Sequence, residues 1–475
     1  MHTTRFLGTI AAAGLIYLAP SLTIFAVKPA PDGGYPGQNT AEGEDALLSL
    51  TTGSRDTAIG FQALLHNTSG VDNTAIGAGA LFSNTTGYDN TASGASALQS
   101  NTDGFFNTAT GNFALFSNLS GHNNTASGTQ ALFNNTSGYD NTAIGTGALF
   151  GNRTGHDNTA TGKQALNSNT HGYFNVATGF WALFSNTTGY ENTANGVGAL
   201  FSNTTGFDNV ATGLQALNNS TTGFFNTATG NFSLFSLTTG SQNTATGVAA
   251  LVSNQTGNNN TAEGVNALFN SIGSNNIALG FEAGTDLVVG DNNIDIGNRG
   301  LAAESNSIRI GTKGTHTATF IAGIAGMPVS GSQVVVNSNG KLGITSSSVR
   351  FKDAIRPIGE ASEVLLHLKP VTFHYKPEID PYGIPQFGLV AEEVEKVEPN
   401  LIARDSEGKV NTVRYEAVNA MLLNEFLKEH QKVKEQGATI AHLEEQVNGL
   451  TARLQKVIDQ IELNNGSMPI AFAPH

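Results

Sequence analysis

The sequence predicts a mainly β protein, in which a parallel β-solenoid or β-roll rod is followed by a small α+β domain that ends in a coiled-coil helix. Three observations predict it. A 17-residue pattern recurs from Asn39 without insertion or deletion, the composition changes sharply at Ser346, and apolar residues near the C-terminus repeat at spacings of three and four. A chain of 475 residues favours several domains or an elongated repeat body over one compact core.

The repeat unit reads Asn-Thr-Ala-x-Gly-x-x-Ala-Leu-x-x-Asn-Thr-Thr/Ser-Gly-x-x. Fourteen units follow one another from Asn39 to the unit that starts at Asn260, each beginning 17 residues after the last. Loops tolerate changes of length, so a period this rigid indicates that every residue belongs to a repeating structural coil. We therefore predict a 17-residue β repeat array over residues 39–275, with two short strands in each coil.

Columns of identical residues define the predicted coil. The Leu and Ala columns suit a thin apolar interior. Gly at the fifth position, from Gly43 to Gly264, and a second column, from Gly53 to Gly257, indicate corners that need positive φ or a close approach of coils. Asn beside each corner can ladder its amide from coil to coil. A helix is excluded because Gly and Asn-Thr pairs recur throughout and no 3.6-residue apolar spacing persists.

A looser aromatic column follows the Leu column. We expect these rings either to pack between subunits or to form an adhesive stripe. The column consists of Phe82, Phe116, Phe133, Phe150, Phe184, Phe201 and Phe235.

The register slips at Gly273, since Asn260 and Asn276 are 16 residues apart. The pattern then becomes Asn-Ile-Asp-Ile-Gly297 and Ser-Ile-Arg-Ile-Gly311, with glycines 14 residues apart, and its apolar/polar alternation predicts a β stalk over residues 276–345. These short Ile-Gly motifs resemble the head repeats of trimeric autotransporter adhesins (YadA-like). The resemblance implies a surface-exposed fibre.

From Ser346 charged residues become frequent and Gly thins out, which is typical of a mixed α/β domain, here assigned to residues 346–417. Its motifs, in order, are Ser347-Ser-Val-Arg-Phe-Lys352, a helical segment near 360–368, Pro370-Val-Thr-Phe373, Phe387-Gly-Leu-Val-Ala-Glu-Glu-Val-Glu395 and Val413-Arg-Tyr415.

That order of motifs resembles the self-cleaving intramolecular chaperone domain of phage endosialidases and tail fibres. The resemblance implies a domain that assembles a trimer, guides the folding of the upstream β fibre and is then released by a cut before the motif Ser. It assigns Ser347 and Lys352 as the catalytic pair and Ser346–Ser347 as the scissile bond. The sequence departs from the family pattern at Ser348, where the family usually has Asp.

The implied chemistry is plausible for these residue types. A serine hydroxyl is a weak nucleophile, and a lysine with a lowered pKa can serve as its base. Ser347 and Lys352 are five residues apart and can meet across a turn. The alternative is that these residues form a Ser-rich linker with a surface lysine. The enzymatic activity that this sequence predicts is at most self-cleavage.

Residues 418–462 are predicted to form a coiled-coil helix, because an a/d register is held for about three heptads. The mixture of Ile, Val and Leu is compatible with two or three strands, and the resemblance implies three. Helical structure is expected to begin near Glu416, and Gly437 is a point where it can be interrupted. The seam consists of Ile440, Leu443, Val447, Leu450, Leu454, Val457 and Ile461.

The first 30 residues resemble a secretory signal, with His2 and Arg5 before an apolar run and a Pro/Gly-rich stretch after it. An uncleaved membrane anchor is the alternative reading, because about 20 apolar residues can span a bilayer. Either reading predicts export to the cell surface or the medium of a bacterium.

Composition excludes several classes of function. A formal charge of −14 and a pI near 5.2 argue against a nucleic-acid partner. No cofactor motif and no metal-ligand spacing is present, and the chain has no cysteine. We expect a homotrimeric surface fibre, structural or adhesive, with a surface glycan or protein left open as its ligand. The alternative is a phage-type tail-fibre or receptor-binding protein.

Overall fold

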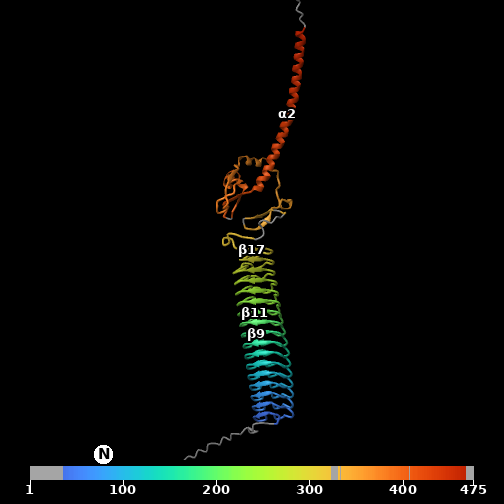
Figure 1. Ribbon diagram of the computed structural model, residues 1–475, viewed down its shortest axis with the longest axis vertical. Helices are drawn as coiled ribbons and strands as arrows, with labels where there is room; N and C mark the ends of the chain where they lie inside the picture. The colour runs from blue at the N-terminus through green and yellow to red at the C-terminus, as the bar shows by residue number, and fades with distance from the viewer. Residues whose placement is uncertain (1–35, 322–329, 332, 338, 406, 467–475) are drawn as a thin grey trace, which may run out of the picture. The chain divides into compact units, whose positions relative to one another are not determined.

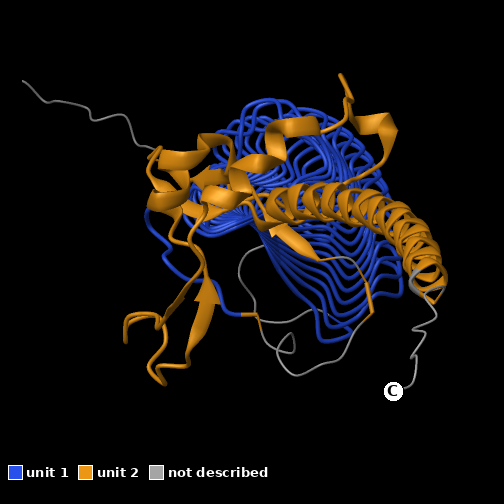
Figure 2. Cartoon of the chain, turned by 90° about the horizontal axis from the view of Figure 1, so that it is seen from above, with its two compact units in different colours: residues 1–320 blue, residues 321–475 orange. Residues whose placement is uncertain are grey.

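The computed structural model describes residues 36–321, 330–331, 333–337, 339–405 and 407–466, and the chain divides into two compact units, residues 1–320 and 321–475 (Figure 2). The signal or anchor predicted for residues 1–30 lies outside the described residues. Among the helices that are described, none combines the length and the apolar character needed to cross a membrane.

The first unit is a parallel β-solenoid whose coils stack as a rod (Figure 1). Each coil contributes one strand of three residues to a single 17-stranded sheet. The strands are β1 (Thr40–Glu42), β2 (Thr57–Ile59), β3 (Thr74–Ile76), β4 (Thr91–Ser93), β5 (Thr108–Thr110), β6 (Thr125–Ser127), β7 (Thr142–Ile144), β8 (Thr159–Thr161), β9 (Val176–Thr178), β10 (Thr193–Asn195), β11 (Val210–Thr212), β12 (Thr227–Thr229), β13 (Thr244–Thr246), β14 (Thr261–Glu263), β15 (Ile277–Leu279), β16 (Ile294–Ile296) and β17 (Ile308–Ile310).

Every strand pairs in parallel with the strand of the next coil, so the predicted solenoid is confirmed. Identical positions pair with one another, as when Ala143 lies beside Ala160. The sheet continues past residue 275: Thr261 pairs with Ile277, and Ile294 pairs with Ile308. The first part of the predicted stalk is therefore more of the same sheet, built from coils of altered length.

The prediction of two short strands per coil was wrong, because the described coils contain one strand each and otherwise turns and bends. The reason is a set of residues with left-handed backbone that keeps the rest of the coil from extending. The ninth-position Leu is one of them, with φ of 51° at Leu132. Such a conformation costs an L-residue about 1–2 kcal/mol. Full burial of the Leu side chain, worth about 1.5–3 kcal/mol, offsets that cost.

The interior is thin, as the sequence predicted. Ala at the third and eighth positions and Leu at the ninth form one continuous core that runs from Ala41 to Leu287. Small side chains suffice because the two sides of each coil lie close together. The fifth-position glycines follow from the close approach of successive coils: Gly94 has φ of 146°, and a Cβ there would lie 2.5 Å from the carbonyl oxygen of Gly111 in the next coil. The second glycine column needs only the close approach, since Gly87 has no positive φ but its Cβ would meet the Gly104 oxygen at 2.5 Å.

Two ladders of buried asparagines join the coils, which confirms the predicted amide ladder. In the first ladder, the Oδ1 atom of Asn73 accepts hydrogen bonds from the backbone N–H and the Nδ2 of Asn90, both at 3.1 Å. The Nδ2 of Asn90 also donates to the Gly104 carbonyl at 2.8 Å. In the second ladder, Asn118 Nδ2 donates to Asn101 Oδ1 at 2.8 Å. Side chains at these positions are fully buried, so each bond is made in a dry interior.

The second ladder runs from Asn67 to Asn203. At its upper end the next coil has Ser220, and the Oδ1 of Asn203 and the Oγ of Ser220 are buried without a hydrogen-bond partner. At its lower end the preceding coil has Leu50, which offers no acceptor to Asn67. Asp56 compensates there: its Oδ2 accepts from Asn67 Nδ2 at 3.0 Å, while its Oδ1 accepts from the N–H of Asn73 at 2.9 Å.

The described residues of the second unit form three small antiparallel pairs and two α-helices. Its core is small, with Val394, Leu401, Ile402 and Val413 buried. The predicted helical segment near 360–368 is a 3-10 helix. The elements are β18 (Val334–Val336), β19 (Leu342–Ile344), η1 (Val349–Phe351), η2 (Gly359–His367), β20 (Val371–Phe373), β21 (Gln386–Gly388), α1 (Ala391–Val397), η3 (Pro399–Leu401), β22 (Ile402–Arg404), β23 (Val410–Val413) and α2 (Tyr415–Asn465).

The predicted coiled-coil segment lies within α2, which spans 51 residues without interruption at Gly437. The aliphatic residues of the predicted seam are all exposed in the single chain, from 50% at Val457 to 62% at Leu450 and Leu454. A helix of this kind gains most of its stability from packing, so α2 presents a face that is built for a partner.

The ladder generates a first prediction. Asn135→Ala removes the donor to Asn118 Oδ1 and the acceptor for Asn152 Nδ2, and should lower the free energy of unfolding by about 3 kcal/mol. Urea unfolding followed by circular dichroism measures it. The neighbouring Asn134→Ala, at a half-buried position, should change stability by about 0.5 kcal/mol or less. Equal losses in the two variants would refute the ladder as a source of stability.

A second prediction concerns pH. Burial raises the pKa of the Asp56 carboxyl from 3.8 to about 6, although hydrogen bonds from Asn73 oppose the shift. The folded state therefore holds this proton more tightly than the unfolded chain does. As pH rises from about 4 to about 6, the unfolded chain ionises first and this site loses stability. Relative to the wild type, Asp56→Asn should gain free energy of unfolding across that range; a difference that is constant with pH contradicts the assignment.

Candidate self-cleavage site

The predicted catalytic pair lies around η1, at the start of the second unit's α+β portion. Ser348 forms the N-cap of this short helix, and its Oγ accepts from the backbone N–H of Arg350 at 3.4 Å and from the Arg350 Nε at 3.2 Å. Lys352 closes the turn with a backbone N–H bond to the Val349 carbonyl at 3.2 Å. One tight turn therefore separates Ser347, which precedes the N-cap, from Lys352, which follows the helix.

The turn brings the two predicted residues into contact. Lys352 Nζ donates to Ser347 Oγ at 3.4 Å. This is the long end of hydrogen-bond distance, and both side chains are exposed to solvent. The geometry matches a nucleophile beside a basic group, while the catalytic roles of Ser347 and Lys352 and the scissile bond Ser346–Ser347 remain predictions.

The cap explains the one departure from the family motif. Asp and Ser are both strong N-cap residues, because either side chain accepts from the first free N–H groups of a helix. Ser348 does this in the present chain. The substitution therefore keeps the turn that holds Ser347 and Lys352 together, and the change of residue type does not by itself remove the pair.

The surroundings of the pair are mixed and open, since Arg350 lies in the same turn as two apolar side chains. Val349 and Phe351 flank it and are 71% and 70% exposed. A lysine acts as a base only in its neutral form, which burial favours. In the single chain the pair is wet, so a covering surface over Val349 and Phe351 would bring it closer to what base catalysis requires.

A polar network fixes η2 against α2 in the same unit. Ser362 donates to the Glu425 carboxylate at 2.5 Å and accepts from Asn424 Nδ2 at 2.6 Å. Lys428 bonds to Glu425 at 2.8 Å, and this bond and the one from Ser362 lower the pKa of the Glu425 carboxyl. Nothing in the sequence marked these residues as partners, since they are more than 60 residues apart.

An apolar groove of about 700 Å³ lies between η2, the β20–β21 pair and the first turns of α2. It has no ionisable lining residue, so it offers no acid or base for chemistry. Phe387 and Leu422 on its wall are 84% and 58% exposed. The groove is lined by Leu365, Leu368, Pro370, Val371, Thr372, Phe387, Gly388, Leu389, Val418 and Leu422.

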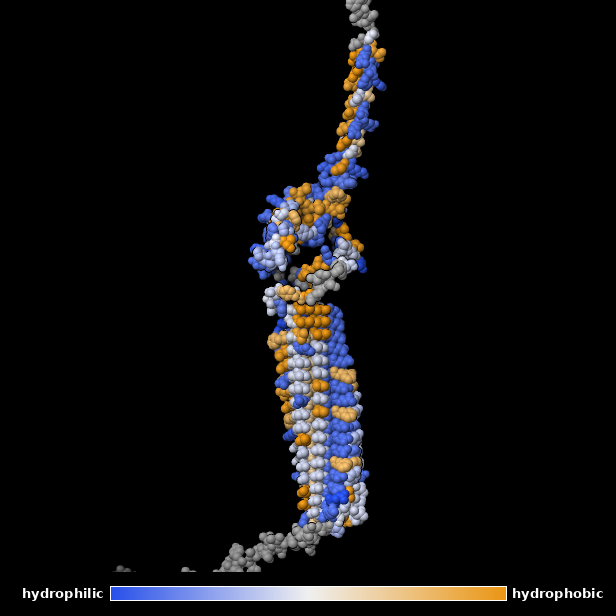
Figure 3. All heavy atoms as spheres, in the orientation of Figure 1, coloured by the Kyte–Doolittle hydropathy of each residue, from blue (hydrophilic) through white to orange (hydrophobic). Residues whose placement is uncertain are grey.

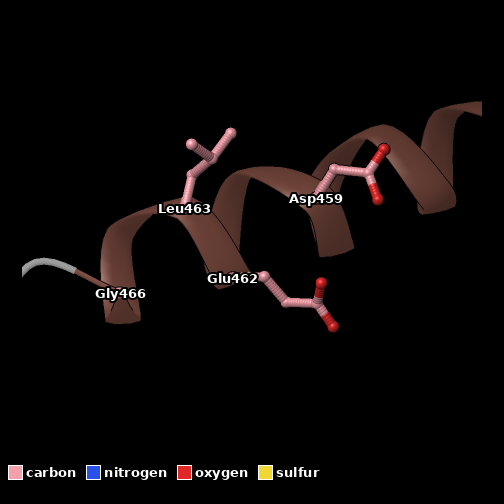
Figure 4. A pocket seen from close by; sticks show the side chains of 4 residues that line it. All are labelled: Asp459, Glu462, Leu463 and Gly466. Carbon is pink, nitrogen blue, oxygen red and sulfur yellow. The ribbon is translucent and has the colours of Figure 1, made fainter.

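A second hollow, at the end of α2, is not a site. Asp459, Glu462 and Leu463, on the last turns of α2, and its C-cap Gly466 bound it (Figure 4). Within the described residues, no group of three His, Asp or Glu side chains is placed to hold a metal ion.

Comparison with known proteins agrees with the motif order. Residues 347–403 match the family model described as chaperone of endosialidase, and the match begins at Ser347. No curated protein and no solved structure matches the chain. The chain is thus a β-solenoid repeat rod that carries a C-terminal chaperone domain of the endosialidase type.

Proposed function

We propose that this protein is an exported, trimeric surface fibre, structural or adhesive, whose C-terminal domain assembles three chains and then releases itself. The observation that carries the proposal is the exposed aliphatic stripe of α2 next to a domain that matches the chaperone of endosialidase. A rod built from near-identical coils repeats the same small apolar core along its length, which favours a structural role over catalysis on another molecule.

A trimerising domain addresses a physical difficulty of the rod. Identical 17-residue units can pair in the wrong register by a whole coil, because each unit offers the same columns to its neighbour. Joining three chains at one end gives folding a common starting point. Release of the domain afterwards would leave a product that is held by its unfolding barrier.

The contact between Ser347 Oγ and Lys352 Nζ supports the following cleavage step. The hydroxyl, with its proton taken by the neutral amine, adds to the carbonyl carbon of Ser346. The bond to the nitrogen of Ser347 then breaks, and that nitrogen takes the proton. Water hydrolyses the resulting ester, so the carboxylate ends at Ser346 and the new amino terminus at Ser347.

Export and adhesion rest on the sequence of residues 1–30 and on the surface of the rod. Nine aromatic rings stack along one side, with centroids 4.8–5.2 Å apart between successive rings of this column. Phe106, Phe174 and Phe225 beside them are about half exposed. Such a stripe suits a glycan or protein surface as ligand. The likeness of the Ile-Gly coils to YadA-like heads supports the same proposal.

The aromatic column that follows the Leu column includes Phe116, Phe133 and Phe150. Its rings stack on one another within the same rod, with centroids 5.0–5.1 Å apart, and are only partly exposed.

A phage-type tail fibre is the second candidate, favoured by the match to the chaperone of endosialidase. Removal of residues 1–30 during passage across a membrane distinguishes the two, because a phage fibre needs no such step.

Trimer formation yields a third prediction. Leu450→Glu places a charge in the aliphatic seam and should increase the trimer dissociation constant by at least about 100-fold, since burying an unpaired carboxylate costs several kcal/mol. Ala441→Glu, off the seam on an exposed position, should leave the trimer intact. Sedimentation equilibrium of the full chain measures both; a monomeric wild type would end the proposal.

Self-cleavage yields a fourth prediction. Mass spectrometry of the purified chain should find a fragment that begins at Ser347. Ser347→Ala and Lys352→Arg should each abolish it, because the first removes the nucleophile and the second replaces the base with a group that stays protonated. Ser346→Ala is the control and should still be cut. An uncut wild-type chain that is trimeric would refute the cleavage and leave the trimer standing.

A further inference from the structure

The outward face of the solenoid sheet changes character over its last three strands. In every strand the middle residue points into the core and the two flanking residues point out. From β1 to β14 the outward residues are mostly Thr and Ser, with a few scattered aliphatic ones. In β15 to β17 all of them are aliphatic: Ile277, Leu279, Ile294, Ile296, Ile308 and Ile310. We call these six residues the aliphatic patch.

Five of the six patch residues are exposed in the single chain, and Ile294 is half-buried. Ile308 and Ile310 are 68% and 65% exposed, and Phe281, which follows the turn after β15, is 72% exposed. In Figure 3, two columns along the rod are pale over most of their length and become orange over the last rows, next to the C-terminal end of the solenoid. A contiguous apolar area of this kind on a flat sheet marks a contact surface.

The inward residues change in the opposite direction. The middle strand residue is Ala from β1 to β15, and it becomes Asp295 in β16 and Arg309 in β17. Asp295 is only 2% exposed, and Arg309 Nη2 bonds to Glu304 Oε1 at 2.9 Å. These charged residues close the end of the apolar core, as the terminal units of repeat proteins usually do.

The coils of β16 and β17 are therefore charged inside and aliphatic outside, whereas the coils before β15 have Ala inside and mostly Thr or Ser outside. The charged inward residues are explained within a single chain, because they lie at the end of the apolar core. The aliphatic exterior has no such explanation in a single chain in water, where each exposed Ile is a cost to solubility. Something must cover the outer face of β15 to β17.

We propose that the aliphatic patch is the surface through which three copies of this chain contact one another along their rods, and that the Thr-faced coils before it remain apart. The proposal rests on the proposed trimer. A second copy is the fitting occupant because the patch is uncharged and flat and offers no polar group to orient a different ligand. It also precedes, in the same chain, the domain that matches the chaperone of endosialidase.

Two identical copies also have the same spacing between the rows of the aliphatic patch. The rows of the patch follow the strand spacing of about 4.8 Å, so equal rows meet when copies lie side by side in the same direction. The Thr and Ser columns of β1 to β14 keep their hydrogen bonds to water and gain little from contact. The contact should thus be confined to the C-terminal end of the solenoid.

The absence of cysteine from the sequence makes the test clean. Ile296→Cys puts a single thiol in the patch, and Ile144→Cys puts one at the equivalent outward position of β7, where Ile144 is 45% exposed. The full-length variants are treated with a short bifunctional maleimide and separated under denaturing conditions. We expect covalent dimers from Ile296→Cys at a yield at least about tenfold above that from Ile144→Cys.

A charged variant supplies a second measurement. Ile296→Glu combined with Ile310→Cys should reduce cross-linking at least about tenfold relative to Ile310→Cys alone. The solenoid itself accepts the substitution, because Glu263 already stands in the same column of β14. Ile144→Glu combined with Ile310→Cys is the matched control and should cross-link as Ile310→Cys does.

The outcomes separate the two proposals when the mass of each uncross-linked sample is measured by sedimentation. A trimer without cross-links at residues 296 and 310 overturns the patch as the contact and leaves the trimer. Equal cross-linking at 144 and 296 overturns the confinement to the last coils. A monomer overturns the proposed function and this inference with it.

Discussion

The in-register hydrogen bonding of one coil to the next is the constraint on which the rest of the rod depends. A buried asparagine has two donors and an acceptor, and in this interior its partners lie on the next coil or on the glycine carbonyls beside it. Those distances are met only when equivalent residues stack directly. The unchanging period, the glycines at close approaches and the left-handed leucines all follow from that requirement.

The ladders also show what happens when the pattern varies. A serine in the ladder position leaves Asn203 Oδ1 without a donor, whereas a leucine at position 50 is balanced by a carboxylate that takes over as acceptor. Both variations lie toward the ends of the second ladder. The middle coils tolerate less, since a buried polar atom with a missing partner costs more than the bond itself contributes.

Much of the rod could be predicted because columns are visible in the sequence: the Leu, Ala, Gly and Asn positions are the buried ones. The left-handed φ at Leu132 could not be predicted, since leucine rarely adopts it, and the number of strands per coil followed from that error. In the second unit, motif order located the turn from Ser347 to Lys352. The Ser362–Glu425 contact was invisible because it joins distant segments without a periodic signal.

The uniform coil has a consequence for how such a protein can change over generations. Recombination between near-identical units adds or deletes one whole coil, and every column then still stacks on its own kind. Each event alters the length of the rod by about 4.8 Å. Changes of other sizes must be absorbed in the turns, as in the shorter coils after Asn260, where the strands still pair in register. The length of the rod can therefore change by whole coils, while the segments on either side of the repeat array keep their sequence and their roles.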